Sequence, residues 1–281
     1  MEIEFENVTY TLRVNTPLEY KLLNDISFSI KENTITGFLG NSGNGKSTIP
    51  KLISALVKPT SGTIKVYGKV INGKKIKDIN KFRSSIGYVY ENPDEMFVSN
   101  SVRSEIVFAL DYFKYPTKSK VKRVEDALKI VGLDKSYLSL KLNKLSLNDK
   151  KKIALASVLV YNPKIIILDE PCIGLSVKEK KELIRIIRLL KNKHNKTIII
   201  LTKDTDFLYK IANYVYILDG GSIVAYGETD LLLKKELLDT YGLYYPSTLE
   251  FTYLANMRKN ANLEYYKDVS DLIKGVYRSV F

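Results

Sequence analysis

A glycine-rich stretch near the amino terminus has the residues and the spacing of a phosphate-binding loop. Residues 40–48 read GNSGNGKST, which fits the pattern G-x-x-x-x-G-K-[ST]. Glycines let consecutive backbone N–H groups curl around a β-phosphate, and the dipole of a following helix favours the same negative charge. Lys46 would reach the β- and γ-phosphates, and the Ser47 hydroxyl would ligate Mg²⁺. The candidate nucleotide-binding residues of this loop are Gly40, Asn41, Ser42, Gly43, Asn44, Gly45, Lys46, Ser47 and Thr48.

An acidic pair at the end of an aliphatic run supplies a second chemical element. Residues 165–170 read IIILDE, so a buried strand is expected to end in Asp169 and Glu170. Asp169 can hold Mg²⁺ through a water molecule, and Glu170 is placed to orient an attacking water. The pair is a weak signal alone and a strong one when it follows a phosphate loop. The guanine-specifying pattern T-K-x-D is absent, because Asp204 comes one place too early in LTKDTD. The predicted ligands are therefore ATP and Mg²⁺.

The elements that must position these residues can be traced along the chain. The runs IEFENVTY and LNDISFSI alternate polar and apolar residues, which is typical of half-buried antiparallel strands. The run TITGFLG leads into the glycine loop, and a helix is expected over KSTIPKLISALVKP. Pro50 removes a backbone donor there and can kink the helix. The apolar stripe of that helix is Leu52, Ile53, Leu56 and Val57.

Strands and helices alternate in the rest of the chain. From about residue 91 to 163 the pattern is mostly helical, and KVKRVEDALKIVGL places Val121, Val124, Leu128 and Val131 on one face. Strands return at KIIILDEP, at TIIILT and as a pair in YVYILDGGSIVAYG. The amphipathic run VKEKKELIRIIRLLKNK separates the first two. Strands alternating with helices predict a parallel sheet with helices packed on it.

Composition limits the class of protein. The 281 residues are 45% hydrophobic and 27% charged, which is ordinary for a soluble globular protein. The opening MEIEFENVTY is acidic where a secretory signal is basic, and no apolar run approaches the ~20 residues of a membrane span. A single Cys172 excludes an internal disulfide and suits a reducing interior. A single His194 excludes a histidine-clustered metal site. The net charge of +13 comes from lysines scattered along the chain, which favours codon composition as its origin. Nucleic-acid binding and docking beneath an anionic membrane are the alternative interpretations of this charge.

Three segments taken in order resemble the nucleotide-binding subunit of ABC transporters. These are GNSGNGKST, LSLNDKKKIALASVLVYNPKIIILDEPCIGLS and IILTKD. Four others, NTPLEYKLLNDISF, LVKPTSGTI, IGYVYENPDEMF and YGLYYPSTLEFTYLANMRKN, narrow the resemblance to the ATPase subunits of energy-coupling factor (ECF) transporters, which import vitamins and metal ions. The resemblance covers nearly the whole chain.

The resemblance implies a fold and a division of the chain. The fold is α/β, a P-loop NTPase (RecA-like) ABC cassette with an N-terminal antiparallel β subdomain and an inserted α-helical subdomain. The cassette is expected at 1–235, with its nucleotide-binding core at 1–90 and 164–235 and its helical subdomain at about 91–163. A C-terminal helical extension is expected at 236–281.

The resemblance also implies a function and partners. In that family two ATPases pair head to tail, and each ATP lies between one subunit's P-loop and the other's signature loop, beneath a transmembrane T component. The chain is thus expected to be a peripheral ATPase at the cytoplasmic membrane face. Its partners would be a second ATPase, in a heterodimer, the T component and a substrate-binding membrane subunit. One alternative is an ATP-binding pseudo-ATPase that supports an active partner. Another is a soluble ABC protein acting on ribosomes or DNA; because such proteins carry two cassettes or a long coiled coil, no nucleic-acid partner is expected.

The family signature L-S-G-G-Q is altered in this chain. It reads Leu145, Ser146, Leu147, Asn148 and Asp149. The two glycines normally let backbone amides touch the partner's γ-phosphate, and Leu147 puts an isobutyl group near that approach. Ser146 and Asp149 keep the spacing of a capping box. The segment is therefore expected to start a helix and to bind phosphate poorly.

Four further family positions are substituted. Leu12 stands where an aromatic residue stacks on adenine, and Glu91 where a glutamine contacts Mg²⁺ and the attacking water. Ser176 replaces the aspartate that crosses to the partner's P-loop, and Lys203 replaces the histidine that contacts the γ-phosphate. His194 lies in the loop before the strand TIIILT and cannot substitute for that histidine.

The substitutions at 91 and 203 invite a joint interpretation. An uncompensated carboxylate about 4 Å from a γ-phosphate charge costs on the order of 4 kcal/mol at an effective dielectric of 20. Lys203 could cancel the charge of Glu91. The two changes are either coupled in this way or independent drift. By the same resemblance Asp94 and Glu95 lie near the groove for the T component, either as partners for basic residues there or as ordinary solvated acids.

Overall fold

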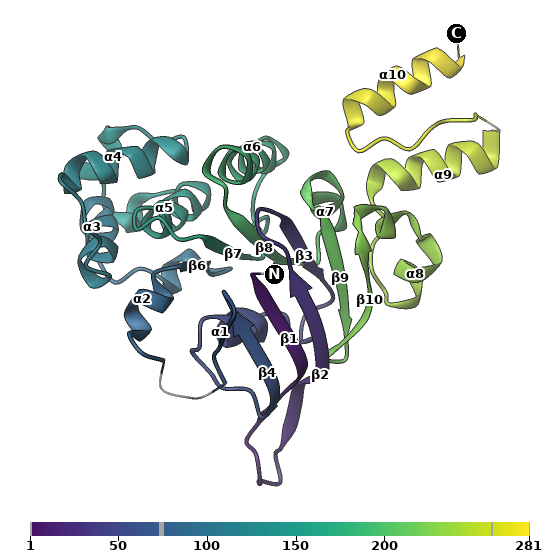
Figure 1. Ribbon diagram of the computed structural model, residues 1–281. Coiled ribbons are helices and arrows are strands. Elements are labelled where there is room, and N and C mark those ends of the chain that lie inside the picture. Colours follow the sequence, from purple (N-terminus) through teal and green to yellow (C-terminus); the bar gives the residue numbers. More distant parts are fainter. Residues whose placement is uncertain (1, 73–75, 260, 281) are drawn as a thin grey trace.

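A computed structural model describes residues 2–72, 76–259 and 261–280 (Figure 1). The outer limits predicted for the cassette and the extension, residues 1 and 281, lie outside this range. Across the described ranges, no helix combines the length and the apolar character that a bilayer crossing requires.

The amino-terminal part of the chain forms a four-stranded sheet in the order β2-β1-β4-β5. Its strands are β1 (Ile3–Leu12), β2 (Tyr20–Ile30), β4 (Ser61–Val66) and β5 (Lys69–Val70). Strand β1 pairs antiparallel with both β2 and β4. The prediction of two half-buried antiparallel strands is therefore confirmed.

A six-stranded sheet in the order β10-β9-β3-β8-β7-β6 forms the centre of the molecule. Its strands are β3 (Ile35–Leu39), β6 (Ile86–Val89), β7 (Ile165–Asp169), β8 (Thr197–Thr202), β9 (Tyr214–Asp219) and β10 (Ser222–Glu228). All neighbours are parallel except β10, which pairs antiparallel with β9 at the edge. Because β3, β7 and β8 are covered on both faces, they read as continuous aliphatic runs. The predicted parallel sheet is confirmed.

The two faces of the large sheet contribute to two separate hydrophobic cores. Residues Ile165 and Ile167 pack with the small sheet and helix α1 (Thr48–Ile53), whereas Ile166 and Leu168 pack towards the other helices. Figure 1 shows α6 (Val177–His194) and α7 (Thr205–Ile211) on the side of the large sheet away from the small sheet. Side chains alternate across a strand, so each buried strand serves both cores.

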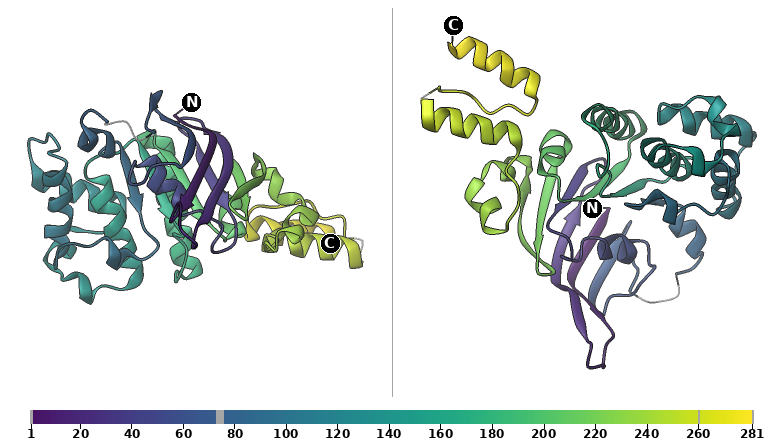
Figure 2. Two further views of the ribbon diagram at one scale, coloured as in Figure 1. Left: turned by 90° about the horizontal axis from the view of Figure 1, so that it is seen from below. Right: turned by 180° about the vertical axis from the view of Figure 1, so that it is seen from behind.

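The remaining helices lie at the two ends of the large sheet, as both views in Figure 2 show. Beside β6 are α2 (Ile79–Arg83), α3 (Val102–Tyr112), α4 (Lys120–Ile130), α5 (Leu147–Leu159) and three 3₁₀ turns, η1 (Pro93–Glu95), η2 (Lys135–Ser139) and η3 (Leu142–Lys144). Beside β10 are η4 (Thr229–Leu233), α8 (Lys235–Thr240), α9 (Ser247–Lys259) and α10 (Val269–Val280).

Helix α1 is shorter than its apolar stripe predicts. It ends at Ile53, and Ala55 adopts a left-handed φ of 51°. The N–H of Leu56 bonds to the Lys51 carbonyl at 2.8 Å and that of Ala55 to the Leu52 carbonyl at 3.0 Å, which is a Schellman motif with alanine in the position usually held by glycine. The expected continuation through Leu56 is therefore wrong, because backbone bonds close the helix first.

Two other residues of the predicted helices lie in a first turn. Pro50 lies in the first turn of α1, where backbone N–H groups have no intrahelical partner, so it removes no helix hydrogen bond. Val121 shares the stripe of α4 but lies in the first turn and stays 55% exposed, whereas Val124, Leu128 and Val131 are buried.

Candidate functional site

The glycine loop joins β3 to α1 at the carboxyl edge of the large sheet. Its residues Ser42, Gly43, Gly45, Lys46, Ser47 and Thr48 line a cavity of about 290 Å³ together with Leu22, Glu91, Asp169 and Glu170. Carboxyl ends of parallel strands meet at one edge, which is why residues far apart in sequence converge here. The structure thus brings together the phosphate loop, the acidic pair and the residue at the family's glutamine position.

Glycine is required at position 45 for two reasons. Its φ is +83°, and a Cβ there would lie 2.3 Å from the carbonyl oxygen of Leu22. The two asparagine side chains of the loop are anchors and are not part of the cavity lining. Asn44 donates to the Leu218 carbonyl at 3.1 Å, and Asn41 donates to the Tyr241 carbonyl at 3.1 Å. These contacts tie the loop to β9 and to the segment after α8.

Lys46 lies inside its own loop and is only 6% exposed. Its ammonium donates to the carbonyl oxygens of Gly40 at 2.6 Å and Asn41 at 2.9 Å. It also lies 4.0 Å from Glu170 Oε1. Burial lowers the pKa of Lys46, and the charges of Glu170 and Asp169 oppose that effect. The loop therefore holds a buried cation beside the two carboxylates.

Asp169 presents one free oxygen. Its Oδ2 accepts a hydrogen bond from the hydroxyl of Tyr88 at 2.9 Å, while its Oδ1 is buried and has no hydrogen-bond partner. A buried, unpartnered carboxylate oxygen is costly unless a cation or water satisfies it. Ser47 at the start of α1 is exposed and makes no side-chain cap bond.

These residues fit a Mg²⁺ ion. The cation takes one or two protein oxygens together with phosphate and water oxygens. Asp169 and Ser47 would hold it, and Glu91 lines the same cavity. Within the described residues there is no cluster of three or more His, Cys, Asp or Glu side chains that could hold a metal by itself. A nucleotide-bound magnesium does not need such a cluster.

Glu170 is held in a strained and buried position. Its φ is +41°, a left-handed backbone that costs a non-glycine residue about 1–3 kcal/mol and that clusters at functional sites. Its Oε2 accepts from the Thr202 hydroxyl at 2.8 Å and its Oε1 from the backbone N–H of Lys203 at 3.1 Å. Burial raises the pKa of Glu170, and the bond from Thr202 counters that rise. A carboxylate with a raised pKa and both oxygens fixed is suited to accept a proton from water.

Thr202 and Tyr88 were not identified from the sequence. Thr202 is 0% exposed and also accepts from the N–H of Asp204 at 3.0 Å. The only local signal for Thr202 was its place as a hydroxyl residue at the end of the aliphatic run IIIL. Tyr88 carried no such signal, because its role depends on the pairing of β6 with β7.

The substituted residues Glu91 and Lys203 both influence the pKa of Lys46. Glu91 is exposed and lines the cavity, whereas the Lys203 side chain is exposed and is not among the lining residues. Among the described residues no ion pair joins Glu91 to Lys203. The charge of Lys203 lowers the pKa of Lys46, while that of Glu91 raises it. The two charges therefore shift the pKa of Lys46 in opposite directions without an ion pair between them.

The altered signature segment begins α5. Ser146 is the N-cap, since its Oγ accepts from the N–H of Asp149 at 3.1 Å. The reciprocal half of the expected capping box is not formed, because the Asp149 carboxylate accepts from the Ser146 hydroxyl at 2.9 Å. Leu147 is 41% exposed and packs on Gly174, where a Cβ would lie 2.4 Å from its Cδ2. Neither these residues nor Asn148 lines the cavity of this chain's own phosphate loop.

Ser176 and Leu12 also lie away from that cavity. Ser176 is the N-cap of α6 and forms a complete capping box with Glu179, so its side chain is engaged within the chain. Leu12 ends β1 opposite Tyr20 and is 40% exposed.

Lys150 pairs with Asp94 at 2.8 Å, so Asp94 already has a basic partner within the chain.

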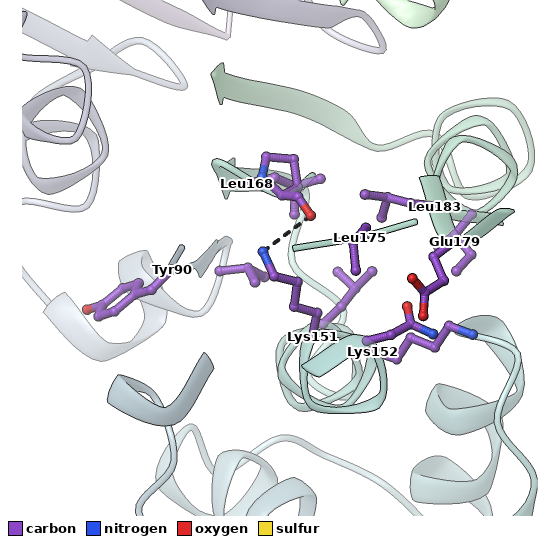
Figure 3. A pocket seen from close by; sticks show the side chains of 12 residues that line it. Tyr90, Lys151, Lys152, Leu168, Leu175, Glu179 and Leu183 are labelled. Carbon is purple, nitrogen blue, oxygen red and sulfur yellow. Dashed lines mark hydrogen bonds between the residues drawn. The ribbon is translucent and has the colours of Figure 1, made fainter. Parts of the chain in front are cut away.

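Helix α5 is tied directly to the loop that carries Glu170. The ammonium of Lys151 donates to the carbonyl oxygens of Glu170 at 3.2 Å and Pro171 at 3.3 Å. Lys151 lines a small, mainly apolar pocket of about 30 Å³ between α5, α6 and the ends of β6 and β7. Figure 3 shows the side chains that line it. Lys152, at the rim, pairs with Glu182 at 2.9 Å. Burial lowers the pKa of Lys151.

Comparison with known proteins identifies chains that are similar in sequence. Residues 23–173 match the family model described as ABC transporter. The chain is 31% identical over 255 residues to the energy-coupling factor transporter ATP-binding protein EcfA2 of Ligilactobacillus salivarius, covering 90% of this chain and 88% of the relative. It is 39% identical over 226 residues to EcfA1 of the same organism, covering 80% and 78%.

Solved structures extend the comparison. The structure of cbiO1 from Clostridium perfringens, described as part of the ABC transporter complex cbiONQ, superposes with a TM-score of 0.76 at 30% identity. The superposition covers 92% of this chain and 96% of cbiO1. The ATP-binding cassette MJ0796, solved as a dimer bound to ADP and Pi, has a TM-score of 0.73 at 23% identity and covers 81% of this chain, which supports the fold.

Proposed function

We propose that the chain is the ATP-binding subunit of an ECF-type importer. It belongs to the ABC transporter family and is similar to the energy-coupling factor ATP-binding proteins. The main support for this proposal is that the phosphate loop, Asp169 and Glu170 converge on one cavity. Both carboxylate oxygens of Glu170 are held there by hydrogen bonds. In this proposal ATP binding and hydrolysis drive uptake of a vitamin or metal ion through a membrane T component.

Each residue of the cavity has its own role in the proposed reaction. The loop amides and Lys46 bind the phosphates. Asp169 and Ser47 would hold Mg²⁺, which would supply positive charge to neutralise the phosphates. Glu170 orients the attacking water and accepts its proton. Thr202 and the Lys203 N–H keep the Glu170 carboxylate in one orientation, so that it needs no rearrangement when water attacks.

A second ATPase is part of the proposal. The signature residues Ser146, Leu147 and Asn148 do not line this chain's own cavity, and in the family this segment faces the ATP held by a second subunit. We infer a head-to-tail pair with a second, less altered ATPase at the cytoplasmic face of the membrane. A substrate-binding membrane subunit would complete the complex and select the solute.

A non-catalytic role is the second candidate. Leu147 occupies a glycine position of the signature and packs on Gly174 of its own chain. An isobutyl group there hinders close approach of backbone amides to a partner's phosphate. In this alternative the chain holds ATP as a structural or regulatory clamp while its partner hydrolyses.

One purification tests both candidates. A tagged form of the chain is isolated from membranes with its partners, and ATP turnover is measured for wild type and Glu170→Gln. The matched control is Glu236→Gln, an exposed residue of α8 away from the cavity. A strong fall in Glu170→Gln alone supports hydrolysis in this chain's own pocket. Unchanged turnover supports the clamp, and recovery of nucleic acid in place of membrane subunits would overturn the importer proposal.

A further inference from the structure

Among the described residues, Tyr88 is the one outside the recognised motifs whose side chain donates a hydrogen bond to the Asp169 carboxylate. It lies on β6 opposite Ile167 of β7 in the parallel register. Side chains two residues apart on a strand share a face, so Asp169 lies one step further along the face that Tyr88 occupies. The half-buried phenol spans that step, and its hydroxyl donates to Asp169 Oδ2 at 2.9 Å.

The Tyr88 hydroxyl is the donor of this hydrogen bond, and Asp169 Oδ2 is the acceptor. A neutral phenol can hold one carboxylate oxygen without competing for the metal. Asp169 Oδ1, by contrast, is buried without a partner, and Asp169 lines the same cavity as Ser47 and Lys46.

We propose that Tyr88 is a positioning residue for Mg²⁺: its hydroxyl fixes one oxygen of Asp169 and leaves the other for the hydrated cation. The inference rests on the proposed ATP-binding function and adds a residue to it. Partners that orient a metal ligand from outside the metal's own shell commonly change metal affinity by about 10–100-fold when removed. The bond is indirect and most Mg²⁺ contacts come from phosphate and water, so the low end of that range applies.

The chain contains a matched control two residues away. Tyr90 follows Tyr88 on the same side of the chain, and the two ring centroids lie 4.4 Å apart. The backbone N–H of Tyr90 bonds to Met96 Sδ, but within the described residues its hydroxyl has no hydrogen-bond partner. Removing that hydroxyl changes aromatic packing as little as it does at Tyr88 and leaves Asp169 untouched.

The test measures metal dependence of nucleotide binding by the full chain, without hydrolysis. A fluorescent ATP analogue is titrated in EDTA and then over a range of Mg²⁺ concentrations for wild type, Tyr88→Phe and Tyr90→Phe. We expect Tyr88→Phe to need about tenfold more Mg²⁺ for half-maximal enhancement of binding. Its affinity in EDTA and the Mg²⁺ requirement of Tyr90→Phe should match wild type.

A double-mutant cycle separates positioning from general damage. Because Tyr88 acts through Asp169, Tyr88→Phe should add nothing to the Mg²⁺ requirement of Asp169→Asn. Tyr88→Phe within twofold of wild type, or additive with Asp169→Asn, would overturn the inference. An equal loss of affinity with and without Mg²⁺ would show a structural role only and would overturn it too. If wild type itself binds no nucleotide, the proposed function fails first, which is a distinct result.

Discussion

The hydroxyl of Thr202 offers a direct test of how the carboxylate of Glu170, the proposed catalytic residue, is held. Thr202→Val keeps the shape of a side chain that is 0% exposed but removes the donor to Glu170 Oε2 at 2.8 Å. It also removes the acceptor for the Asp204 N–H. A hydrogen bond to a charged group contributes about 1.5–3 kcal/mol and one between neutral groups about 0.5–1.5 kcal/mol. The cost of the substitution should therefore depend on whether Glu170 is ionised.

The direction of that pH dependence follows from the pKa of Glu170. Burial raises this pKa above 4.5, so the folded state binds the proton more tightly than the unfolded state. The contribution of Glu170 to stability is full below about pH 4.5 and is lost as the pH rises through the folded pKa. The Thr202 bond lowers the pKa and limits that loss. Without it, the loss with rising pH becomes larger.

The assay is the free energy of unfolding by denaturant at pH 5 and pH 8. We expect Thr202→Val to cost about 2–3 kcal/mol at pH 8 and less at pH 5, because more of Glu170 is protonated at the lower pH and the lost bond is then weaker. Thr252→Val is the control, because Thr252 is also 0% exposed and donates to the Thr248 carbonyl at 2.9 Å, with no ionisable group involved. Its cost should be about 1 kcal/mol at both pH values. Equal pH dependence of the two variants would refute the reasoning.

Three further predictions use the same chain. We expect Lys203→His alone to weaken ATP binding more than Lys203→His with Glu91→Gln, because the single change would leave the Glu91 charge uncompensated at the phosphate loop; equal affinities in a titration would mean independent drift. Gly45→Ala should abolish ATP binding, since its Cβ would lie 2.3 Å from the Leu22 carbonyl oxygen; wild-type affinity by calorimetry would contradict this. Ser176→Ala should lose the capping box of α6 and about 1 kcal/mol of stability while ATP binding stays unchanged; denaturant unfolding checks the first part and the same titration the second.

The sequence alone determined the parts of the molecule whose chemistry is local. A phosphate loop binds through consecutive backbone amides, so its pattern lies within one short segment, 40–48. Strands β3, β7 and β8 are buried on both faces and therefore appear as aliphatic runs. The acidic pair at 169 and 170 follows one of those runs directly. The fold class and the family were predictable for these reasons.

Only the tertiary structure decided what surrounds the two carboxylates. Tyr88 meets Asp169 because β6 pairs with β7 in one register, and Thr202 meets Glu170 because β7 pairs with β8. Register is a property of two strands together, so neither strand's sequence contains it. The contact of Leu147 with Gly174 has the same origin, since it joins the first turn of α5 to the loop after β7, which no local pattern relates. Residues that bind a ligand through their own backbone were readable from the sequence, whereas residues that act by holding other side chains became visible only once the strands were paired.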